Sequence, residues 1–340
     1  MAIITKPKKI SRVDLTDVTS GNSGGSATVI KFSPDNNFIA VSGTSSTKEI
    51  AIWSWNGSTT ISEVETVNMG YACYALSWHP DNDYLAASNF YGDAFKVYSW
   101  NHSDTLTEVE TINTGVNILC AEWHPNGNYL AVGSYTAGSA VKVFSWNGTD
   151  ALAEVENLNT GDKGYRVKWS HDGDFLYVGS PLANKQVAVY SWNGTDALTE
   201  VATYNLTSGA AYNASWTSDD KYLFVGTDVA TKQLLSFAFD GSSLTHKQTI
   251  DLGYRGNDVS LWNDRYLAIG MAHTGSATAA FLKLYKFNIT TETLTEIDSL
   301  TYTATGIAEV DFQSNGRYLA VGMNAETGVT VRVVKVFDHP

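Results

Sequence analysis

The stretch Tyr129–Ser134, with the sequence YLAVGS, recurs in similar form seven times along this chain of 340 residues. The copies begin at residues 38, 84, 129, 175, 222, 266 and 318, so successive copies lie 46, 45, 46, 47, 44 and 52 residues apart. A period of this size indicates stacked supersecondary units, because one such unit is too small to bury its apolar face alone. The repeat therefore predicts one domain, residues 1–340, built from seven similar units.

Each copy lies among three other short apolar runs. A polar turn such as His124–Asn128 (HPNGN) precedes it, in which proline presets φ and glycine adopts positive φ. The run after it ends in a hairpin signal such as Asn147-Gly148, and a fourth run such as Leu152–Glu156 follows. Each repeat thus predicts four short strands and no helix. The first strand of each repeat ends at a large apolar residue: Phe32, Trp78, Trp123, Trp169, Trp216, Leu261 or Phe312.

Four antiparallel strands repeated seven times predict an all-β fold, a seven-bladed β-propeller with four-stranded blades. The two ends of the chain support closure of the ring. The stretch 10–16 (ISRVDLT) matches the fourth run of the other repeats, and the last repeat lacks that run. We therefore expect the N-terminal strand to complete the last blade beside the C-terminal strand, which removes two unpaired edges.

The chain resembles WD40-type propellers over nearly its whole length. The turn at Ser33–Asn36 (SPDN) and the ending Val334–Asp338 (VKVFD) are similar to the turn and closing strand of that family. Two motifs depart from it: the Trp-Asp pair is replaced by pairs such as Trp53-Ser54, and the Gly-His pair is reduced to a glycine such as Gly70. Both motifs contribute to the family's structural His–Asp hydrogen-bond network. The stretch Ser134–Trp146 also resembles lactonase-type propellers.

Composition narrows the class of protein. The chain is 43% hydrophobic but has no run of about 18 apolar residues, so we expect no membrane span. Residues 1–10 are rich in lysine and lack the apolar core of a signal peptide, so we expect no export signal. The expected location is the cytoplasm or an assembled particle such as a virion. Cys73 and Cys120 are predicted to be buried thiols and not a disulfide.

The net charge of −13 argues against a nucleic-acid partner, because duplex nucleic acids are bound by basic surfaces. Much of the acidity falls on the predicted outermost strands. Charged side chains there protect exposed strand edges from pairing with other molecules. The acidic residues on these strands are Glu63, Glu65, Glu108, Glu110, Glu154, Glu156, Glu200 and Glu296.

Motifs for catalysis or metal binding are absent from the sequence. There is no phosphate-binding loop, no nucleophile elbow and no His-x-x-x-His or Cys-x-x-Cys spacing. His79 and His124 occupy equivalent turns, and we interpret them as turn residues. Asp81 and Asp83 resemble the start of a calcium loop, but no glutamate follows at the twelfth position. We therefore predict no catalytic residue, no cofactor and no metal.

Two groups of residues remain as candidate sites. Polar residues of the innermost strands should face the central channel, where Arg166, Asp258 and Glu309 would form a charged funnel. That funnel supports an alternative function as a lactonase-like hydrolase, although no histidine accompanies it.

The second group lies on the face made by the loops between blades and the loops between second and third strands. Aromatic and arginine side chains on such loops are typical of binding hot spots. The sequence therefore predicts a non-enzymatic binding or structural propeller, which contacts a protein or glycan and belongs to a larger assembly such as a virion surface or tail. The candidate residues are Phe90, Tyr91, Tyr135, Lys163, Tyr165, Tyr254, Arg255 and His273.

Overall fold

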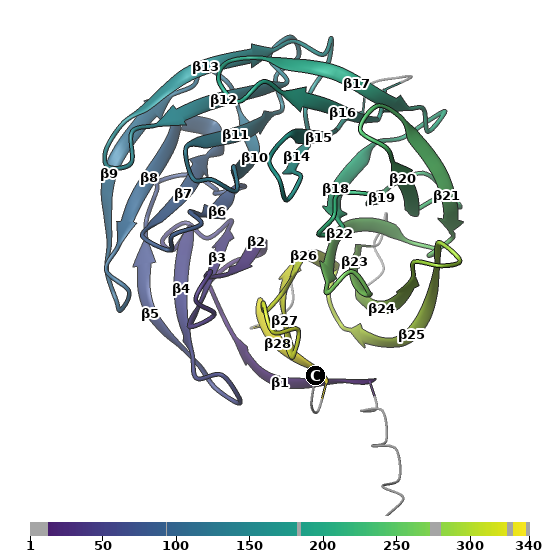
Figure 1. The fold of residues 1–340 in the computed structure, drawn as a ribbon. Coiled ribbons are helices and arrows are strands. Elements are labelled where there is room, and N and C mark those ends of the chain that lie inside the picture. Colours follow the sequence, from purple (N-terminus) through teal and green to yellow (C-terminus); the bar gives the residue numbers. More distant parts are fainter. Residues whose placement is uncertain (1–12, 93, 182–184, 273–279, 325–328, 338–340) are drawn as a thin grey trace, which may run out of the picture.

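The computed structural model describes residues 13–337, except residue 93 and the segments 182–184, 273–279 and 325–328. Within this part the chain forms 28 strands, β1 to β28, and one short 3-10 helix, η1 (Phe90–Gly92). The strands build a closed ring, with the first strand of each blade nearest the centre (Figure 1). The predicted all-β fold with seven blades is confirmed.

The first four blades follow the order of the sequence from the centre outward. Blade 1 contains β2 (Ala27–Phe32), β3 (Phe38–Gly43), β4 (Ile50–Trp55) and β5 (Ile61–Val67). Blade 2 contains β6 (Leu76–Trp78), β7 (Tyr84–Asn89), β8 (Ala94–Trp100) and β9 (Leu106–Asn113). Blade 3 contains β10 (Ile118–Trp123), β11 (Tyr129–Ser134), β12 (Val141–Trp146) and β13 (Leu152–Leu158). Blade 4 contains β14 (Arg166–Trp169), β15 (Phe175–Gly179), β16 (Val187–Trp192) and β17 (Leu198–Tyr204).

The last three blades include the point where the two ends of the ring meet. Blade 5 contains β18 (Ala211–Trp216), β19 (Tyr222–Thr227), β20 (Leu234–Phe239) and β21 (Leu244–Ile250). Blade 6 contains β22 (Arg255–Trp262), β23 (Tyr266–Ala272), β24 (Ala280–Asn288) and β25 (Thr293–Tyr302). Blade 7 contains β26 (Gly306–Phe312), β27 (Tyr318–Asn324), β28 (Val331–Phe337) and β1 (Val13–Gly21).

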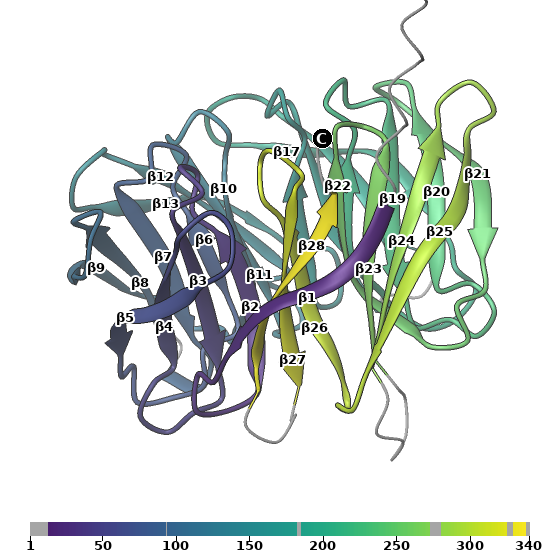
Figure 2. The ribbon, with the colours of Figure 1, turned by 90° about the horizontal axis from the view of Figure 1, so that it is seen from below.

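The N-terminal strand closes the ring, as the sequence predicts. β1 pairs antiparallel with β28, from Val13 opposite Phe337 to Gly21 opposite Val331. Figure 2 shows this strand crossing the outside of blade 7. The strand extends to Gly21, beyond the predicted end at Thr16. The first predicted residues, 10–12, lie outside the described part.

The leading aromatic residue of each hexapeptide forms a joint between two blades. Its ring meets the aromatic residue that ends the third strand of the next blade, edge to face, with ring centroids 4.7 to 5.2 Å apart. This contact explains why the repeat begins with Tyr or Phe. The seven pairs are Phe38–Trp100, Tyr84–Trp146, Tyr129–Trp192, Phe175–Phe239, Tyr222–Phe287, Tyr266–Phe337 and Tyr318–Trp55.

The outermost strands are joined by their acidic residues. In β5, β9 and β13 one glutamate accepts a backbone N–H of the next blade: Glu156 Oε2, for example, accepts from Leu198 N at 2.9 Å. Others pair with a lysine of their own blade. This arrangement is consistent with the predicted protection of strand edges and also binds neighbouring blades together. The five Lys–Glu pairs are Lys48–Glu63, Lys96–Glu108, Lys142–Glu154, Lys185–Glu200 and Lys283–Glu296.

The turns between first and second strands are also linked from blade to blade, in one of two ways. In the first, an Asp or Asn with positive φ accepts a backbone N–H from the turn of the preceding blade. Asp220 (φ 57°) accepts from His171 N at 2.8 Å, and Asp264 (φ 51°) accepts from Ser218 N at 2.7 Å. Asn36 accepts in the same way from Ser314 N at 2.8 Å, across the closure of the ring.

In the second kind of link, a ring of one blade reaches the turn of the next. His79 Nε2 lies 2.9 Å from Gly127 O, and His124 Nε2 lies 3.0 Å from Gly173 O. Glycine is required there, since a Cβ on Gly127 would lie only 2.6 Å from the His79 ring. Both histidines are thus turn residues, as predicted.

The junction between blades 1 and 2 has neither kind of link. Asn82 has the positive φ (72°) of an accepting turn residue, but its buried Oδ1 has no hydrogen-bond partner among the described residues. Pro34 occupies the position of the donors His171 and Ser218, and proline has no N–H to donate. The innermost strand of blade 2, β6, is also only three residues long. This junction therefore lacks a bond that other junctions have.

We predict that Pro34→Ser restores this bond, because the new N–H can be donated to Asn82 Oδ1. The new hydrogen bond should raise the free energy of unfolding by about 1 kcal/mol. Part of this gain is offset because the unfolded chain has more conformational entropy once the proline is replaced. Pro80→Ser is the matched control, since the next blade presents Gly127 and no side-chain acceptor. Urea unfolding should show Pro34→Ser to be the more stable of the two variants. Equal stabilities would show that Asn82 does not accept from this position.

Candidate functional site

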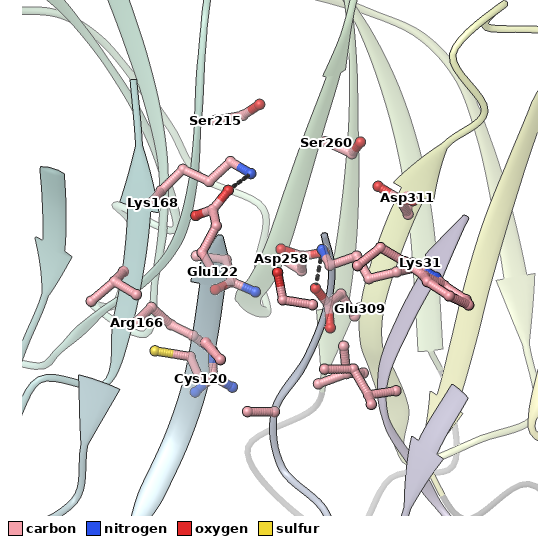
Figure 3. A pocket seen from close by; sticks show the side chains of 18 of the residues that line it. Lys31, Cys120, Glu122, Arg166, Lys168, Ser215, Asp258, Ser260, Glu309 and Asp311 are labelled. Carbon is pink, nitrogen blue, oxygen red and sulfur yellow. Dashed lines mark hydrogen bonds and ion pairs between the residues drawn. The ribbon is translucent and has the colours of Figure 1, made fainter. Parts of the chain in front are cut away.

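The central channel contains the first candidate site. It encloses a cavity of about 290 Å³ lined by the innermost strands of the blades. Alternate residues of these strands point into it, which is why the polar residues of the predicted funnel reach the channel (Figure 3). Its charged lining residues are Lys31, Glu122, Arg166, Lys168, Asp258, Glu309 and Asp311.

Two ion pairs bridge neighbouring blades across the channel wall. Lys31 of β2 pairs with Glu309 of β26, and Lys168 of β14 pairs with Glu122 of β10 (Figure 3). The Glu309 side chain is only 7% exposed, whereas Lys31 retains 30% exposure to the channel. Lys31 is therefore the cation that compensates the acidic side of the cavity.

The channel acids also accept backbone hydrogen bonds from the next blade. Asp258 Oδ2 accepts from Val310 N at 2.8 Å, and Asp311 Oδ2 accepts from Phe32 N at 2.7 Å. These N–H groups lie on the inner edge of a sheet, where no further strand can accept them. Ser77, Glu122 and Ser260 accept equivalent bonds from Trp123, Trp169 and Phe312. A large part of the polar lining thus holds the ring together.

Burial shifts the pKa values of this cluster. Burial and the neighbouring Glu309 raise the pKa of Asp258 to about 7. Burial raises the pKa of Asp311 to about 6, with Lys31 opposing the shift. Burial alone would lower the pKa of Lys31, but the carboxylates of Glu309, Asp311 and Asp258 outweigh it and raise that pKa. A carboxyl group with a pKa of about 7 is partly protonated near neutral pH, which is the protonation state that general acid–base catalysis requires.

The structure brings only part of the predicted funnel together. Asp258 and Glu309 interact electrostatically beside Lys31, which sequence reasoning had not singled out. Arg166 lies apart from them in Figure 3, close to Cys120. Its Nη1 donates to the carbonyl oxygens of Tyr165 at 2.8 Å and Leu119 at 3.4 Å. Among the described residues Arg166 forms no ion pair.

The second candidate site lies on the face that carries the loops between blades and between second and third strands. Six aromatic residues there form a chain of ring contacts, which we call the aromatic arc. Successive centroid distances are 4.9 Å for Tyr74–Phe90, 6.3 Å for Phe90–Tyr135, 5.9 Å for Tyr135–Tyr165 and 6.0 Å for Tyr165–Tyr212. Tyr91 joins the arc at Phe90, with centroids 4.8 Å apart.

Two cations lie over rings of the arc. Lys163 Nζ is 3.6 Å from the centroid of Tyr135, and Arg255 Cζ is 5.2 Å from that of Tyr212. Of the arc residues, Tyr91 is 66% exposed and Tyr135 is 43% exposed. The arc therefore offers rigid aromatic surface to a partner, since each ring is supported by its neighbours.

The arc contains four of the predicted loop residues, Phe90, Tyr91, Tyr135 and Tyr165, together with the predicted cations Lys163 and Arg255. Tyr254 stacks on Phe281 at 4.6 Å, and His273 lies outside the described residues. Sequence reasoning missed Tyr74 and Tyr212. The signal that could have revealed them is position: Tyr74, Tyr165 and Tyr212 each lie four residues before the tryptophan that ends their strand.

Other predictions about sites can be compared directly with the structure. Cys73 and Cys120 are buried free thiols, as predicted. In the described part of the chain, no group of three or more His, Cys, Asp or Glu side chains is arranged to hold a metal ion. No helix in that part is long and apolar enough to cross a membrane.

Comparisons with known proteins agree with this fold. The family model for the WD domain, G-beta repeat, matches residues 107–145, which run from β9 to the third strand of blade 3. No curated protein matches the chain in sequence. The fold and the matched repeat together make the chain a WD40-like seven-bladed β-propeller.

Solved structures of several propellers are similar to this chain. The Cps50 (Swd1) propeller domain of Myceliophteria thermophila has a TM-score of 0.70 at 13% identity, covering 95% of this chain and 100% of that one. A candidate 6-phosphogluconolactonase of Bacteroides fragilis has a TM-score of 0.73 at 17% identity, covering 88% and 94%. Hydrazine synthase of Kuenenia stuttgartiensis has a TM-score of 0.72 at 14% identity, covering 94% and 98%. At such identities the similarity is one of fold.

Proposed function

We propose that this protein is a non-enzymatic binding propeller that holds a protein or glycan partner on its loop face. The observation that carries the proposal is the aromatic arc, whose rings run continuously from Tyr74 in blade 2 to Tyr212 in blade 5. Propellers of the WD40 type generally mediate protein interactions. A surface rich in Thr, Ser and Asn further supports a place in the cytoplasm or in a larger assembly, such as a virion surface or tail.

The arrangement of the two sites favours the loop face over the channel. The channel acids accept backbone N–H groups of neighbouring blades, so substituting them changes the scaffold itself. The arc residues Tyr91 and Tyr135 instead expose much of their side chains. Tyrosine and arginine bury large areas on binding with little loss of side-chain entropy, which is why they dominate interface hot spots.

We predict that Tyr135→Ala and Arg255→Ala each weaken partner retention by about 1–2 kcal/mol, the range typical of hot spots. The measurement is the amount of partner that co-purifies from the native source, quantified by mass spectrometry. Ile289→Ala is the control, because Ile289 is 54% exposed in the turn between β24 and β25, on the opposite face. All three melting temperatures should match the wild type. Contacts mapping to the outer strands near Glu108 would contradict the proposal.

A lactonase-like hydrolase is the second candidate function. It is favoured by the pKa of Asp258, about 7, inside a cavity, and by the shared fold of the Bacteroides lactonase candidates. The test measures hydrolysis of 6-phosphogluconolactone in the presence of the wild type and of Glu309→Ala. Under our proposal, neither protein accelerates hydrolysis above the spontaneous rate of the lactone. Hydrolysis that is lost in Glu309→Ala and retained in Tyr135→Ala would replace the binding function with this one.

A further inference from the structure

The cations of the arc differ from most other lysines of the protein in their partners. Five lysines beside the outer strands are each paired with a glutamate. Lys163 and Arg255 instead lie over tyrosine rings, and within the described residues neither has a carboxylate in ion-pair distance. Lys163 hydrogen-bonds Tyr135 and Arg255 hydrogen-bonds Tyr212, and each cation has further N–H donors that a ligand could use.

The carboxylates near the arc each accept at least one hydrogen bond from nearby loop residues. Asp228 Oδ1 accepts from Ala210 N at 2.7 Å, and its Oδ2 accepts from Tyr212 OH at 3.3 Å. Asp162 Oδ1 accepts from Lys163 N, and Asp251 Oδ1 accepts from Gly253 N. These acids therefore fold the loops locally. Within the described residues, none of these acids forms an ion pair with Lys163 or Arg255.

Arg255 carries the clearest sign of an unmet bond. Its Nε is shielded from solvent and has no acceptor among the described residues. A buried N–H without a partner is costly, so the guanidinium gains a hydrogen bond if it turns toward an incoming acceptor. Carboxylate is the acceptor that matches the planar fork of arginine in two bonds.

The two ends of the arc have different character. At the blade 2 end, Tyr74, Phe90 and Tyr91 form a purely aromatic group, with Tyr91 the most exposed. At the blade 4 to 6 end, the rings alternate with Lys163 and Arg255. Steps of 6.3, 5.9, 6.0 and 5.2 Å lead from Phe90 to Arg255. An extended segment of about seven residues spans such a path at ~3.3 Å per residue.

From these observations we infer that the arc binds an extended acidic polypeptide segment, with an apolar side chain on Phe90 and Tyr91 and carboxylates at Lys163 and Arg255. The inference rests on the proposed function and names its partner class. A polypeptide fits better than a polyanionic glycan, because the described residues at the aromatic end of the arc, Tyr74, Phe90 and Tyr91, offer apolar surface and no charge. The net charge of −13 does not oppose it, since many of the outer-strand acids are already paired.

The test is selection of a random dodecapeptide phage library on the full-length protein. We expect the enriched peptides to contain an aromatic or aliphatic residue followed by several Asp or Glu residues. A synthetic peptide of the enriched sequence is then titrated by fluorescence anisotropy. Arg255→Gln and Lys163→Gln should each weaken its binding about tenfold, the effect of one charge-assisted hydrogen bond. Lys185→Gln is the matched control, because Lys185 lies on a neighbouring loop but is paired with Glu200.

The outcomes separate this inference from the proposed function. Enriched peptides without acidic residues that still need Tyr135 would overturn the inference and leave the binding face in place. Peptides whose binding is unaffected by Tyr135→Ala would overturn both. Equal losses of peptide affinity in Arg255→Gln and Lys185→Gln would show that binding depends on non-specific electrostatic attraction, and would overturn the inference. A library that enriches nothing, while oligogalacturonate binds in an Arg255-dependent way, would assign the arc to a glycan and overturn the polypeptide.

Discussion

Deletion of residues 1–17 is expected to lower the melting temperature by about 10 °C or more, because it removes the first half of the strand that closes the ring. Blade 7 would keep β26, β27 and β28, and the outer edge of β28 would lose the partner it has along residues 334–337. A deletion of residues 1–12 is the matched control, since it ends before the first residue of β1. That shorter deletion should leave the melting temperature unchanged.

The size of this effect follows from contacts that β1 makes with two blades. Leu15 is buried, and its N–H donates to Asp298 Oδ2 of blade 6 at 2.7 Å. Asp17 accepts from Tyr302 OH at 3.0 Å and from Arg332 Nη1 at 3.1 Å. Loss of one buried leucine, two partly buried hydrogen bonds and part of the backbone pairing with β28 amounts to about 5 kcal/mol. An unchanged melting temperature for the 1–17 deletion would show that the ring does not depend on this strand.

Lys31→Met is expected to destabilise the protein by about 3 kcal/mol at pH 8, the lower end of the range for breaking a buried pair. The lower end applies because Lys31 keeps 30% of its side chain exposed to the channel. Removal of the cation leaves Asp258, Glu309 and Asp311 close together, with the weaker influence of Lys168 on Asp311 left to oppose their charge. Lys168→Met is the matched control, and its effect should be smaller because Lys168 is 37% exposed, pairs with Glu122 and has only a weak influence on the pKa of Asp311.

The effect of Lys31→Met should be smaller at pH 5 than at pH 8. The folded pKa values of Asp258 and Asp311, about 7 and 6, lie above the ordinary 3.8. The folded state therefore binds more protons than the unfolded state, and these two acids cost more stability as pH rises from about 4 through 7. Loss of Lys31 increases that cost only where the acids are ionised.

Urea unfolding at pH 5 and pH 8 measures this difference. The double variant Lys31→Met/Asp258→Asn should regain part of the stability at pH 8, because the amide oxygen can still accept from Val310 N without a charge. Equal destabilisation by Lys31→Met at both pH values would mean that the lost interaction is packing and not charge compensation.

The ring of blades could be predicted from the sequence because the repeated residues determine local backbone structure. Turn residues, hairpin signals and the unmatched first strand all follow from backbone rules that act within a few residues. The same rules identified Tyr135 and Tyr165 as loop residues, whereas Arg255, predicted to lie in a loop, is the first residue of β22. They could not show that Tyr135 and Tyr165 stack with an interplanar angle of 6°, since that contact joins different blades.

The features that could not be predicted from the sequence are contacts between residues of different blades. Lys31 and Glu309 lie at opposite ends of the chain and meet only because the ring closes. The missing bond between Pro34 and Asn82 is likewise visible only when the other junctions show what occupies those positions. Arg166 was grouped with Asp258 and Glu309 by strand position alone, and the width of the channel keeps it apart.

The seven aromatic joints also bear on how such a chain can change its length. Each repeat donates the ring that begins its hexapeptide to the next blade and receives a ring at the end of its third strand. A duplicated repeat would therefore bring both aromatic residues that its joints need. One contacts the following blade, and the other contacts the preceding blade. Insertion or loss of a whole repeat keeps every joint complete, whereas insertion of part of a repeat leaves a ring without its counterpart. A whole repeat is thus a unit that can be duplicated without loss, because it contains both aromatic residues through which it contacts its neighbours.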